Sequence, residues 1–178
     1  LTGALSRRAF RDEATRASAL AVRHGHNLSL IMFDLDHFKA INDNNSHHVG
    51  DRVLKACVQT VQGLLRKADS IGRVGGEEFA ILLPHTNRDD AMLVAAKVRE
   101  AIANIVIQGA TGPLPISASF GIATLERNAC DIDELLRRAD TAMYEAKQSG
   151  RNRCVEWQIR EVAPSNLRRV FKAGHISF

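Results

Sequence analysis

The chain has 178 residues, of which 45% are hydrophobic and 25% are charged. That length and composition predict one soluble domain with a substantial core, since roughly 70% of the unfolded surface is buried at about this size. No apolar run reaches the roughly 20 residues of a membrane-spanning helix and no secretion signal opens the chain, so neither a membrane protein nor a secreted one is expected.

Net charge and cysteine content give weaker indications. The net charge of +4 favours an anionic partner such as a nucleotide, a nucleic acid or an anionic surface. Cys57, Cys130 and Cys154 lie far apart, without metal-ligand spacing and in odd number, which predicts reduced thiols in a cytoplasmic protein. Because the first residue is Leu and the chain enters directly into a motif, we interpret it as the end of a longer protein, whose missing part could attach it to a membrane.

Two elements are predicted in the first quarter of the chain. Ser6 is expected to cap a helix that runs to about His24, because apolar residues recur there at helical spacing. The apolar segment 27–35 is expected to be a central strand, and its period of two residues places Asp34 and Asp36 on the same side. A carboxylate at the end of a buried strand is costly unless it accepts hydrogen bonds or meets a cation. Asp34 is therefore a candidate ligand, and a surface carboxylate at a strand exit is the alternative.

A short helix and a long helix are expected next. Residues 37–43 are predicted to form a short helical turn whose first backbone N–H groups are free to meet an anion. Residues 44–50 are rich in turn formers, and Asp51 is expected to open a helix with a broad apolar face. That face is predicted to comprise Val53, Leu54, Cys57, Val58, Val61, Leu64 and Leu65.

The segment 73–79, Arg-Val-Gly-Gly-Glu-Glu-Phe, lies between two apolar runs that are each too short for a helix. A Gly-Gly pair between two such runs predicts a hairpin, because glycine accepts the positive φ that tight turns require. Glu77 and Glu78 are thus expected at a tight turn at the end of a sheet. Considered alone, a solvated acidic turn is the alternative interpretation.

The remaining elements follow at regular spacing. A helix is predicted over 89–105, with Leu93, Ala96, Val98 and Ile102 facing inward. Residues 116–124 alternate as a strand does, and a further helix starts at Asp131 or Asp133 and stops at Gly150. Residues 154–157 are expected to close the sheet, and residues 158–178 form a basic tail that is docked or flexible.

At the Gly75–Phe79 motif the chain resembles the GGDEF family of diguanylate cyclases, whose signature is Gly-Gly, then Asp or Glu, then Glu-Phe. Further matching blocks follow in the family's order and cover residues 1 to about 157. They lie at residues 1–3, 34–43 (Asp-x-Asp-x-Phe-Lys-x-Ile-Asn-Asp), 47–51, 116–124, 139–147 (Ala-Asp-x-Ala-x-Tyr-x-Ala-Lys) and 150–152 (Gly-Arg-Asn). Ser46 stands where the family usually has glycine, which costs about 1 kcal/mol if the position needs a positive φ.

The resemblance implies an α+β domain over residues 1–157. Its central, mostly antiparallel five-stranded sheet would be flanked by helices, as in the ferredoxin-like palm of nucleotide cyclases and polymerases. It also implies that two GTP molecules condense into cyclic di-GMP and two pyrophosphates. Catalysis would need a homodimer, and a sensor region upstream of this chain would regulate it.

The residues themselves favour a metal site. If the 77–78 turn lies beside the strand that ends at Asp34, three carboxylates converge, and a divalent cation would be needed to keep them ionised. Oxygen ligands of this kind select Mg²⁺. By resemblance, Mg²⁺ or Mn²⁺ is held by Asp34, the Leu35 carbonyl, Glu77 and Glu78, and Glu77 also takes part in deprotonating the 3′-hydroxyl.

Two further sites follow from the resemblance. Backbone donors at His37 and Phe38, with Lys39, Lys147 and Arg151, would bind the triphosphate. Asn42 and Asp51 would read the guanine edge, with His47 nearby. Arg66 and Asp69 stand where the family carries the Arg-x-x-Asp of an inhibitory site for the product, and an ordinary solvated helix end is the alternative.

Two other functions are weighed against this one. The first is a binding module that senses GTP or cyclic di-GMP without catalysis, but such degenerate members usually lose the acidic turn that is intact here. The second is a nucleic-acid-binding or polymerase-like domain, which rests only on the basic pI and on the metal chemistry that polymerases share. Since the chain lacks a basic stripe interleaved with aromatic residues, no nucleic-acid partner is expected.

Overall fold

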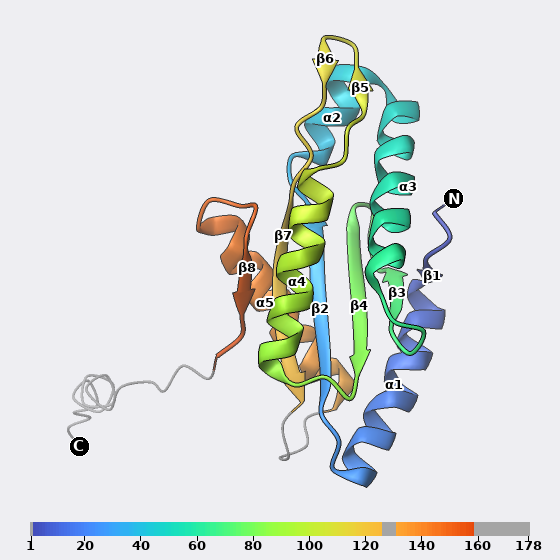
Figure 1. The fold of residues 1–178 in the computed structure, drawn as a ribbon, viewed down its shortest axis with the longest axis vertical. Helices are drawn as coiled ribbons and strands as arrows, with labels where there is room; N and C mark the ends of the chain where they lie inside the picture. The colour runs from blue at the N-terminus through green and yellow to red at the C-terminus, as the bar shows by residue number, and fades with distance from the viewer. Residues whose placement is uncertain (1, 126–130, 159–178) are drawn as a thin grey trace, which may run out of the picture.

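The computed structural model describes residues 2–125 and 131–158. A six-stranded sheet forms its centre, in the order β1-β3-β4-β2-β7-β8. The strands are β1 (Leu5–Ser6), β2 (Leu28–Leu35), β3 (Ser70–Arg73), β4 (Glu78–Pro84), β7 (Ala118–Leu125) and β8 (Cys154–Glu156). A separate hairpin, β5 (Gln108–Gly109) and β6 (Gly112–Pro113), projects next to α2 (Phe38–Asn45) at one end of the molecule (Figure 1).

The predicted α+β class is confirmed, but the prediction of five strands is wrong by one. The three inner pairings, β3 with β4, β4 with β2 and β2 with β7, are antiparallel as expected. The outer pairings of β1 with β3 and of β7 with β8 are parallel, so the sheet is mixed. The sixth strand, β1, has only two residues and lies in the segment that the sequence predicts to be a turn.

Helices cover both faces of the sheet, α1 and α5 on one and α3 and α4 on the other. They are α1 (Arg7–His24), α3 (His47–Leu64), α4 (Arg88–Ala103) and α5 (Ile132–Gln148). Figure 1 shows α3 and α4 in front of the sheet and α5 behind it. Each face of the sheet has its own hydrophobic core, and alternate residues of β2 contribute to the two cores. Ile31 and Phe33 pack on the side of α3 and α4, whereas Leu30 and Met32 pack on the side of α1 and α5. All eight residues of β2 are buried, as expected of a central strand.

Three details of the predicted helices are wrong. The helix expected from Asp51 begins four residues earlier, at His47, because the chain breaks at Ser46 instead. Leu64, predicted to face the core, is 47% exposed at the end of α3. In α4 Leu93 is 60% exposed and Ala96 is exposed too, since the inward stripe is made by Ala91, Ala95, Val98 and Ile102.

Gly121 sets how closely α5 lies on the sheet. A Cβ atom at this position in β7 would overlap the backbone of α5 at Ala139 and Met143, so only glycine allows this approach. The close contact brings the C-terminal end of α5 to the end of β2, where Asp34 lies. None of the helices within residues 2–125 and 131–158 is both long and apolar enough to cross a bilayer.

Part of the sequence interpretation falls outside these residues. The predicted basic tail lies beyond the described residues except for Gln158, and Cys130 lies outside them as well. Cys57 and Cys154 are free thiols, as predicted, and burial raises their pKa to about 12 and about 11.

Candidate active site

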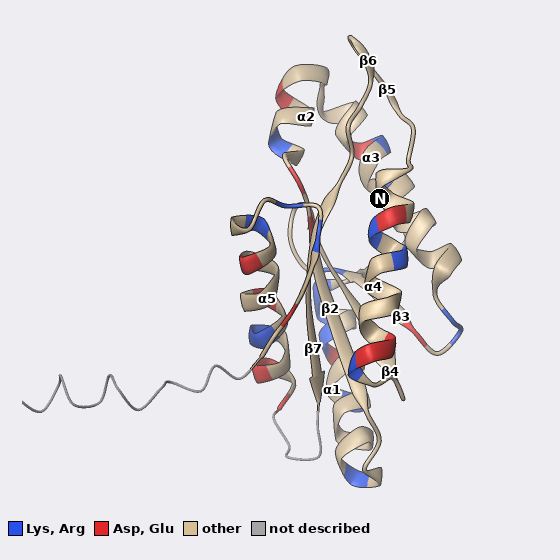
Figure 2. Cartoon of the chain, turned by 60° about the vertical axis from the view of Figure 1, so that its left-hand side comes forward, with Lys and Arg blue, Asp and Glu red and all other residues tan. Residues whose placement is uncertain are grey.

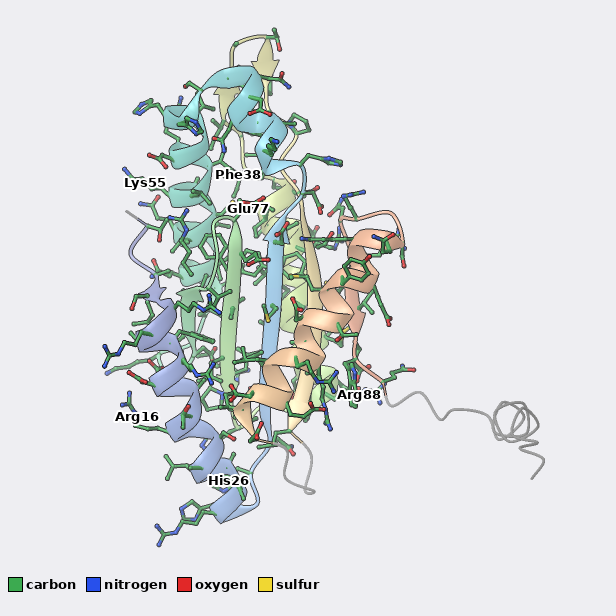
Figure 3. All side chains as sticks on the ribbon, turned by 180° about the vertical axis from the view of Figure 1, so that it is seen from behind. Arg16, His26, Phe38, Lys55, Glu77 and Arg88 are labelled. Atoms are coloured by element: carbon green, nitrogen blue, oxygen red, sulfur yellow. The ribbon has the colours of Figure 1, made fainter. Side chains whose placement is uncertain are left out.

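The end of β2 and the turn between β3 and β4 lie side by side. Asp34 is directly opposite Glu78 in the antiparallel register, and the Leu35 N–H donates a 3.3 Å hydrogen bond to the Glu77 carbonyl. In Figure 3 Phe38 and Glu77 lie close together in the half of the molecule away from His26. The sequence expectation that the acidic turn lies beside the strand of Asp34 is therefore met.

Asp34 is a buried carboxylate that meets a cationic side chain of α5. It is 7% exposed, and its Oδ2 lies 2.8 Å from Nζ of Lys147. Burial raises the pKa of Asp34, while the Lys147 ammonium opposes that rise. The pKa of the Glu77 carboxyl is also raised, first by burial and then by the negative charge of Asp34. The two carboxyl groups are thus close enough to repel each other.

Glu78 lies on the same face of the sheet as Asp34, but its side chain is folded back over Gly75, where a Cβ atom would overlap its carboxylate. The turn that carries Glu77 and Glu78 is held by hydrogen bonds from a third residue, Arg73. Arg73 donates two hydrogen bonds to the Gly76 carbonyl, of 3.0 Å from Nε and 2.6 Å from Nη2. Arg73 therefore holds the turn that carries both glutamates.

The oxygen donors at this point suit a small divalent cation. Within the part of the chain that the structure describes, no three acidic, histidine or cysteine side chains converge as a complete metal site. Mg²⁺ does not need three, because it typically takes one or two carboxylates together with substrate phosphates and water. Asp34, Glu77 and the Leu35 carbonyl fit that pattern, since two carboxylates that repel each other gain from a cation. The part of Glu78 in metal binding stays a prediction.

A second group of predicted residues lies along α2, from its N-cap His37 onward, and in the first turns of α3. The Phe38 side chain is buried, so only its backbone is available to a ligand, whereas His37, Lys39 and His47 are exposed. Asn42 packs its side-chain oxygen directly over Gly50, where a Cβ atom would overlap it. Gly50 precedes Asp51 in the chain, so the two residues expected to read the guanine edge lie on adjoining turns of these helices.

The break between α2 and α3 falls at Ser46, whose backbone has φ 133° and ψ 159°. That region is essentially restricted to glycine, which confirms the sequence concern about a serine at this position. The Ser46 side chain makes no capping hydrogen bond to either helix.

The segment after α5 joins the acidic end of β2. The Asn152 N–H donates a 3.0 Å hydrogen bond to Oδ2 of Asp36. Burial still raises the pKa of Asp34, and the Arg151 charge opposes that rise less than the Lys147 ammonium does. Figure 2 shows basic residues of this segment beside acidic residues at the end of β2. Lys147 therefore contacts Asp34, and Arg151 follows it in the same segment, while their part in phosphate binding stays a prediction.

Arg66 and Asp69 form a turn away from this group. The Arg66 N–H donates a 2.9 Å hydrogen bond to Oδ2 of Asp69, and the Asp69 N–H returns one of 3.0 Å to the Arg66 carbonyl. The turn borders a surface hollow that Glu13 of α1 and Gln62 of α3 also line. The exposed Arg66 side chain leaves its guanidinium open to an anion.

Sequence reasoning missed several residues that shape the site. Arg73, Ser117, Ser119 and Asn152 were not among the candidates, and Asp36 was given no role. The available signal was modest: Arg73 lies two residues before the Gly-Gly pair, and Ser117 and Ser119 alternate along the predicted strand 116–124. Arg73 bonds to Gly76, three residues away, but Asp36 is 81 to 116 residues from Ser117, Ser119 and Asn152, so only the fold brings those partners together.

Known protein families and individual proteins resemble this chain over most of its length. The pattern of the family described as diguanylate cyclase, GGDEF domain, matches residues 1–153. The diguanylate cyclase DgcM of Escherichia coli strain K12 is 42% identical over 156 residues, which are 86% of this chain and 36% of that protein. The chain thus spans about a third of that relative's length.

Solved structures show the same arrangement. The GGDEF domain of DgcB from Caulobacter crescentus, in complex with c-di-GMP, superposes with a TM-score of 0.83 at 29% identity, covering 88% of this chain and 90% of that one. The active GGEEF domain of a diguanylate cyclase from Vibrio cholerae gives a TM-score of 0.82 at 35% identity, covering 86% and 97%. The latter shares the Gly-Gly-Glu-Glu-Phe variant of the turn found at residues 75–79.

Proposed function

The chain belongs to the family of diguanylate cyclase GGDEF domains, and from that premise we propose that it condenses two GTP molecules into cyclic di-GMP and two pyrophosphates. The observation that carries this proposal is the union of Asp34, the 77–78 turn and the Lys147 ammonium at one end of the sheet. A binding module without catalytic activity would have no need to retain an acidic turn beside a buried aspartate.

Each part of GTP has residues suited to it. Lys147 and Arg151 supply positive charge for the triphosphate, and Lys39 adds a third cation at the start of α2. The backbone N–H groups at His37 and Phe38 are free of intrahelical partners, as the first donors of a helix are. Asn42 and Asp51, which present amide and carboxylate oxygens, accept hydrogen bonds from the guanine edge.

The reaction forms one bond and breaks one bond at each α-phosphorus. The 3′-oxygen of one GTP attacks the α-phosphorus of the other, the bond from that phosphorus to the bridging oxygen breaks, and pyrophosphate leaves with the bond electrons. The Glu77 carboxylate takes the proton of the attacking hydroxyl. Mg²⁺ or Mn²⁺, when bound, would neutralise phosphate charge and polarise the phosphoryl group.

Each protomer carries one such GTP site, so two copies must face each other for the ring to close. We therefore include a homodimer in the proposal, with the regulating sensor in the part of the protein that precedes this chain. The turn at Arg66 and Asp69 is proposed to bind the product, because a planar guanidinium can grip a phosphate and stack on guanine. Cyclic di-GMP bound there would inhibit the enzyme.

The experiment incubates the chain with GTP and Mg²⁺ over a range of protein concentrations and identifies cyclic di-GMP by mass spectrometry. Wild type should form product, and the rate per protomer should rise with concentration as the dimer forms. Glu77→Gln should abolish product formation, whereas Glu100→Gln, which changes an exposed glutamate of α4, should leave it unchanged. GTP binding without product in wild type at every concentration would favour the binding module instead.

The inhibitory site needs a measurement of its own. Arg66→Ala should weaken cyclic di-GMP binding, measured by calorimetry, without weakening GTP binding. Equal affinity of wild type and Arg66→Ala for the product would remove Arg66 from that site.

A further inference from the structure

The second acidic residue at the end of β2, Asp36, is engaged in a way that differs from Asp34. It is 4% exposed and accepts three hydrogen bonds. Oδ1 accepts from the Ser119 hydroxyl at 2.7 Å, and Oδ2 accepts from the Ser117 hydroxyl at 2.7 Å and from the Asn152 N–H at 3.0 Å. A buried carboxylate with its donors so arranged is held in one orientation.

The segment that Asp36 contacts has an unusual backbone. Gly150, Arg151 and Asn152 all have positive φ, of 112°, 60° and 45°. Arginine and asparagine pay a conformational penalty in this region, so such a run persists only where surrounding contacts fix it. Here it reverses the chain between α5 and β8, and it places Arg151 just after the helix whose Lys147 contacts Asp34.

Other contacts also hold this segment, but they approach it from elsewhere. The Arg151 N–H bonds back to the Ala146 carbonyl within α5, and Arg99 of α4 bonds to the Asn152 side chain at 3.1 Å. Of the hydrogen bonds that the structure records for residues 150–152, the one from Asn152 to Asp36 is the bond that reaches the residue directly after β2. It therefore fixes the cationic segment relative to the strand that ends in Asp34 and Leu35.

We infer that Asp36 is a positioning residue, which locks the left-handed segment 150–152 and so aims Arg151 at the triphosphate. Asp36 acts through Arg151 and binds neither substrate nor metal. This inference rests on the proposed function for the identity of the substrate, but not for the lock itself.

Two substitutions of Asp36 distinguish a role in positioning segment 150–152 from a role of its negative charge. Asp36→Ala removes both acceptor oxygens, and with them all three hydrogen bonds, and frees the segment. Asp36→Asn can keep the lock, because the amide oxygen can accept at the Oδ2 position from Ser117 and Asn152, while the amide nitrogen donates to the Ser119 hydroxyl, which turns to accept. A metal ligand or an essential charge would not tolerate asparagine in the same way.

The first readout does not depend on activity. Hydrogen exchange at the Asn152 amide, measured by NMR, should be at least about 10-fold faster in Asp36→Ala than in wild type and within about threefold of wild type in Asp36→Asn. Asp12→Asn, which removes an exposed carboxylate of α1, should change nothing. Unchanged exchange in folded Asp36→Ala would overturn the inference while leaving the proposed function intact.

The second readout is the kinetics. Asp36→Ala should raise KM for GTP about 10-fold, as expected when a charged phosphate contact is misplaced, and lower kcat less. Asp36→Asn should stay within about threefold of wild type in both constants. A folded Asp36→Asn as impaired as Asp36→Ala would contradict a geometric role.

Two further outcomes remain decisive. If Asp36→Ala does not fold, Ser119→Ala removes one donor to the carboxylate and should show the same effects at about threefold size. Wild-type exchange and wild-type KM in Ser119→Ala would then overturn the inference. If wild type forms no cyclic di-GMP, the proposed function fails, and hydrogen exchange still decides on the lock.

Discussion

Ser46 carries a conformational strain that one substitution should release. Its φ of 133° and ψ of 159° lie in a region that costs a residue with a Cβ atom about 1–3 kcal/mol. The side chain makes no capping hydrogen bond, so Ser46→Gly loses no such contact. Glycine gives back about 0.5–1 kcal/mol through the greater freedom of the unfolded chain. We expect a net gain of about 1 kcal/mol in the free energy of unfolding.

A gain of that size corresponds to a rise in Tm of about 2–4 °C for a domain of this length. Circular dichroism during heating and urea unfolding should give the same sign. The matched control is Ser149→Gly, because Ser149 also ends a helix but has an ordinary φ of −85°. That control should lose stability. Ser46→Ala keeps the Cβ atom and should gain nothing.

The strain argument is refuted if Ser46→Gly is no more stable than wild type, or if Ser46→Ala gains as much. Either result would mean that the backbone between α2 and α3 relaxes to accommodate a side chain.

Three further predictions concern other parts of the fold. Gly121→Ala should lower the free energy of unfolding by about 2 kcal/mol or more in urea, since its Cβ atom would meet helix backbone that cannot turn aside; wild-type stability would contradict this packing. Arg73→Ala should lower kcat about 10-fold, because the turn loses the two hydrogen bonds to the Gly76 carbonyl, while Tm falls by less than about 2 °C. An unchanged kcat would show that Arg73 does not hold the turn in its active position. Burial raises the pKa of Cys57 from 9.0 to about 12, so the stability that it contributes is complete below pH 9 and is lost as the pH rises towards 12. Between pH 9 and 11 the stability of wild type should therefore fall faster than that of Cys57→Ala, by about 1.4 kcal/mol per pH unit, and parallel curves would be inconsistent with a buried thiol.

Local sequence was enough to predict the central elements of this fold. The apolar run that forms β2 and the helix that ends at residue 148 follow from periodicity, which acts over a few residues. The hairpin expected at Gly75 and Gly76 is present, but the reason given for it is wrong, because neither glycine has a positive φ. Gly75 is instead needed because the Glu78 carboxylate lies where a Cβ atom would be. The sequence did not predict the register that places Asp34 opposite Glu78, because periodicity does not say which strands are neighbours. The metal site could therefore be predicted only on the assumption that these two segments lie side by side.

What could not be predicted depends on contacts distant in sequence. Leu93 has the right spacing for a core position, yet α4 turns a different face inward, which is made by Ala91, Ala95, Val98 and Ile102. Asp36 was matched as part of a motif without a role, because its donors come from β7 and from the segment after α5. The two-residue β1 has no sequence signal of its own and exists because β3 offers it a free edge.

The central claim is that Asp34, beside the acidic turn, makes this end of the sheet a centre for joining two GTP molecules. The most direct measurement is the rate of cyclic di-GMP formation from GTP and Mg²⁺ by Asp34→Asn, compared with wild type at equal dimer content. We predict steady product from wild type and none above background from Asp34→Asn, with both proteins folded by circular dichroism. Equal rates from the two proteins would contradict the account.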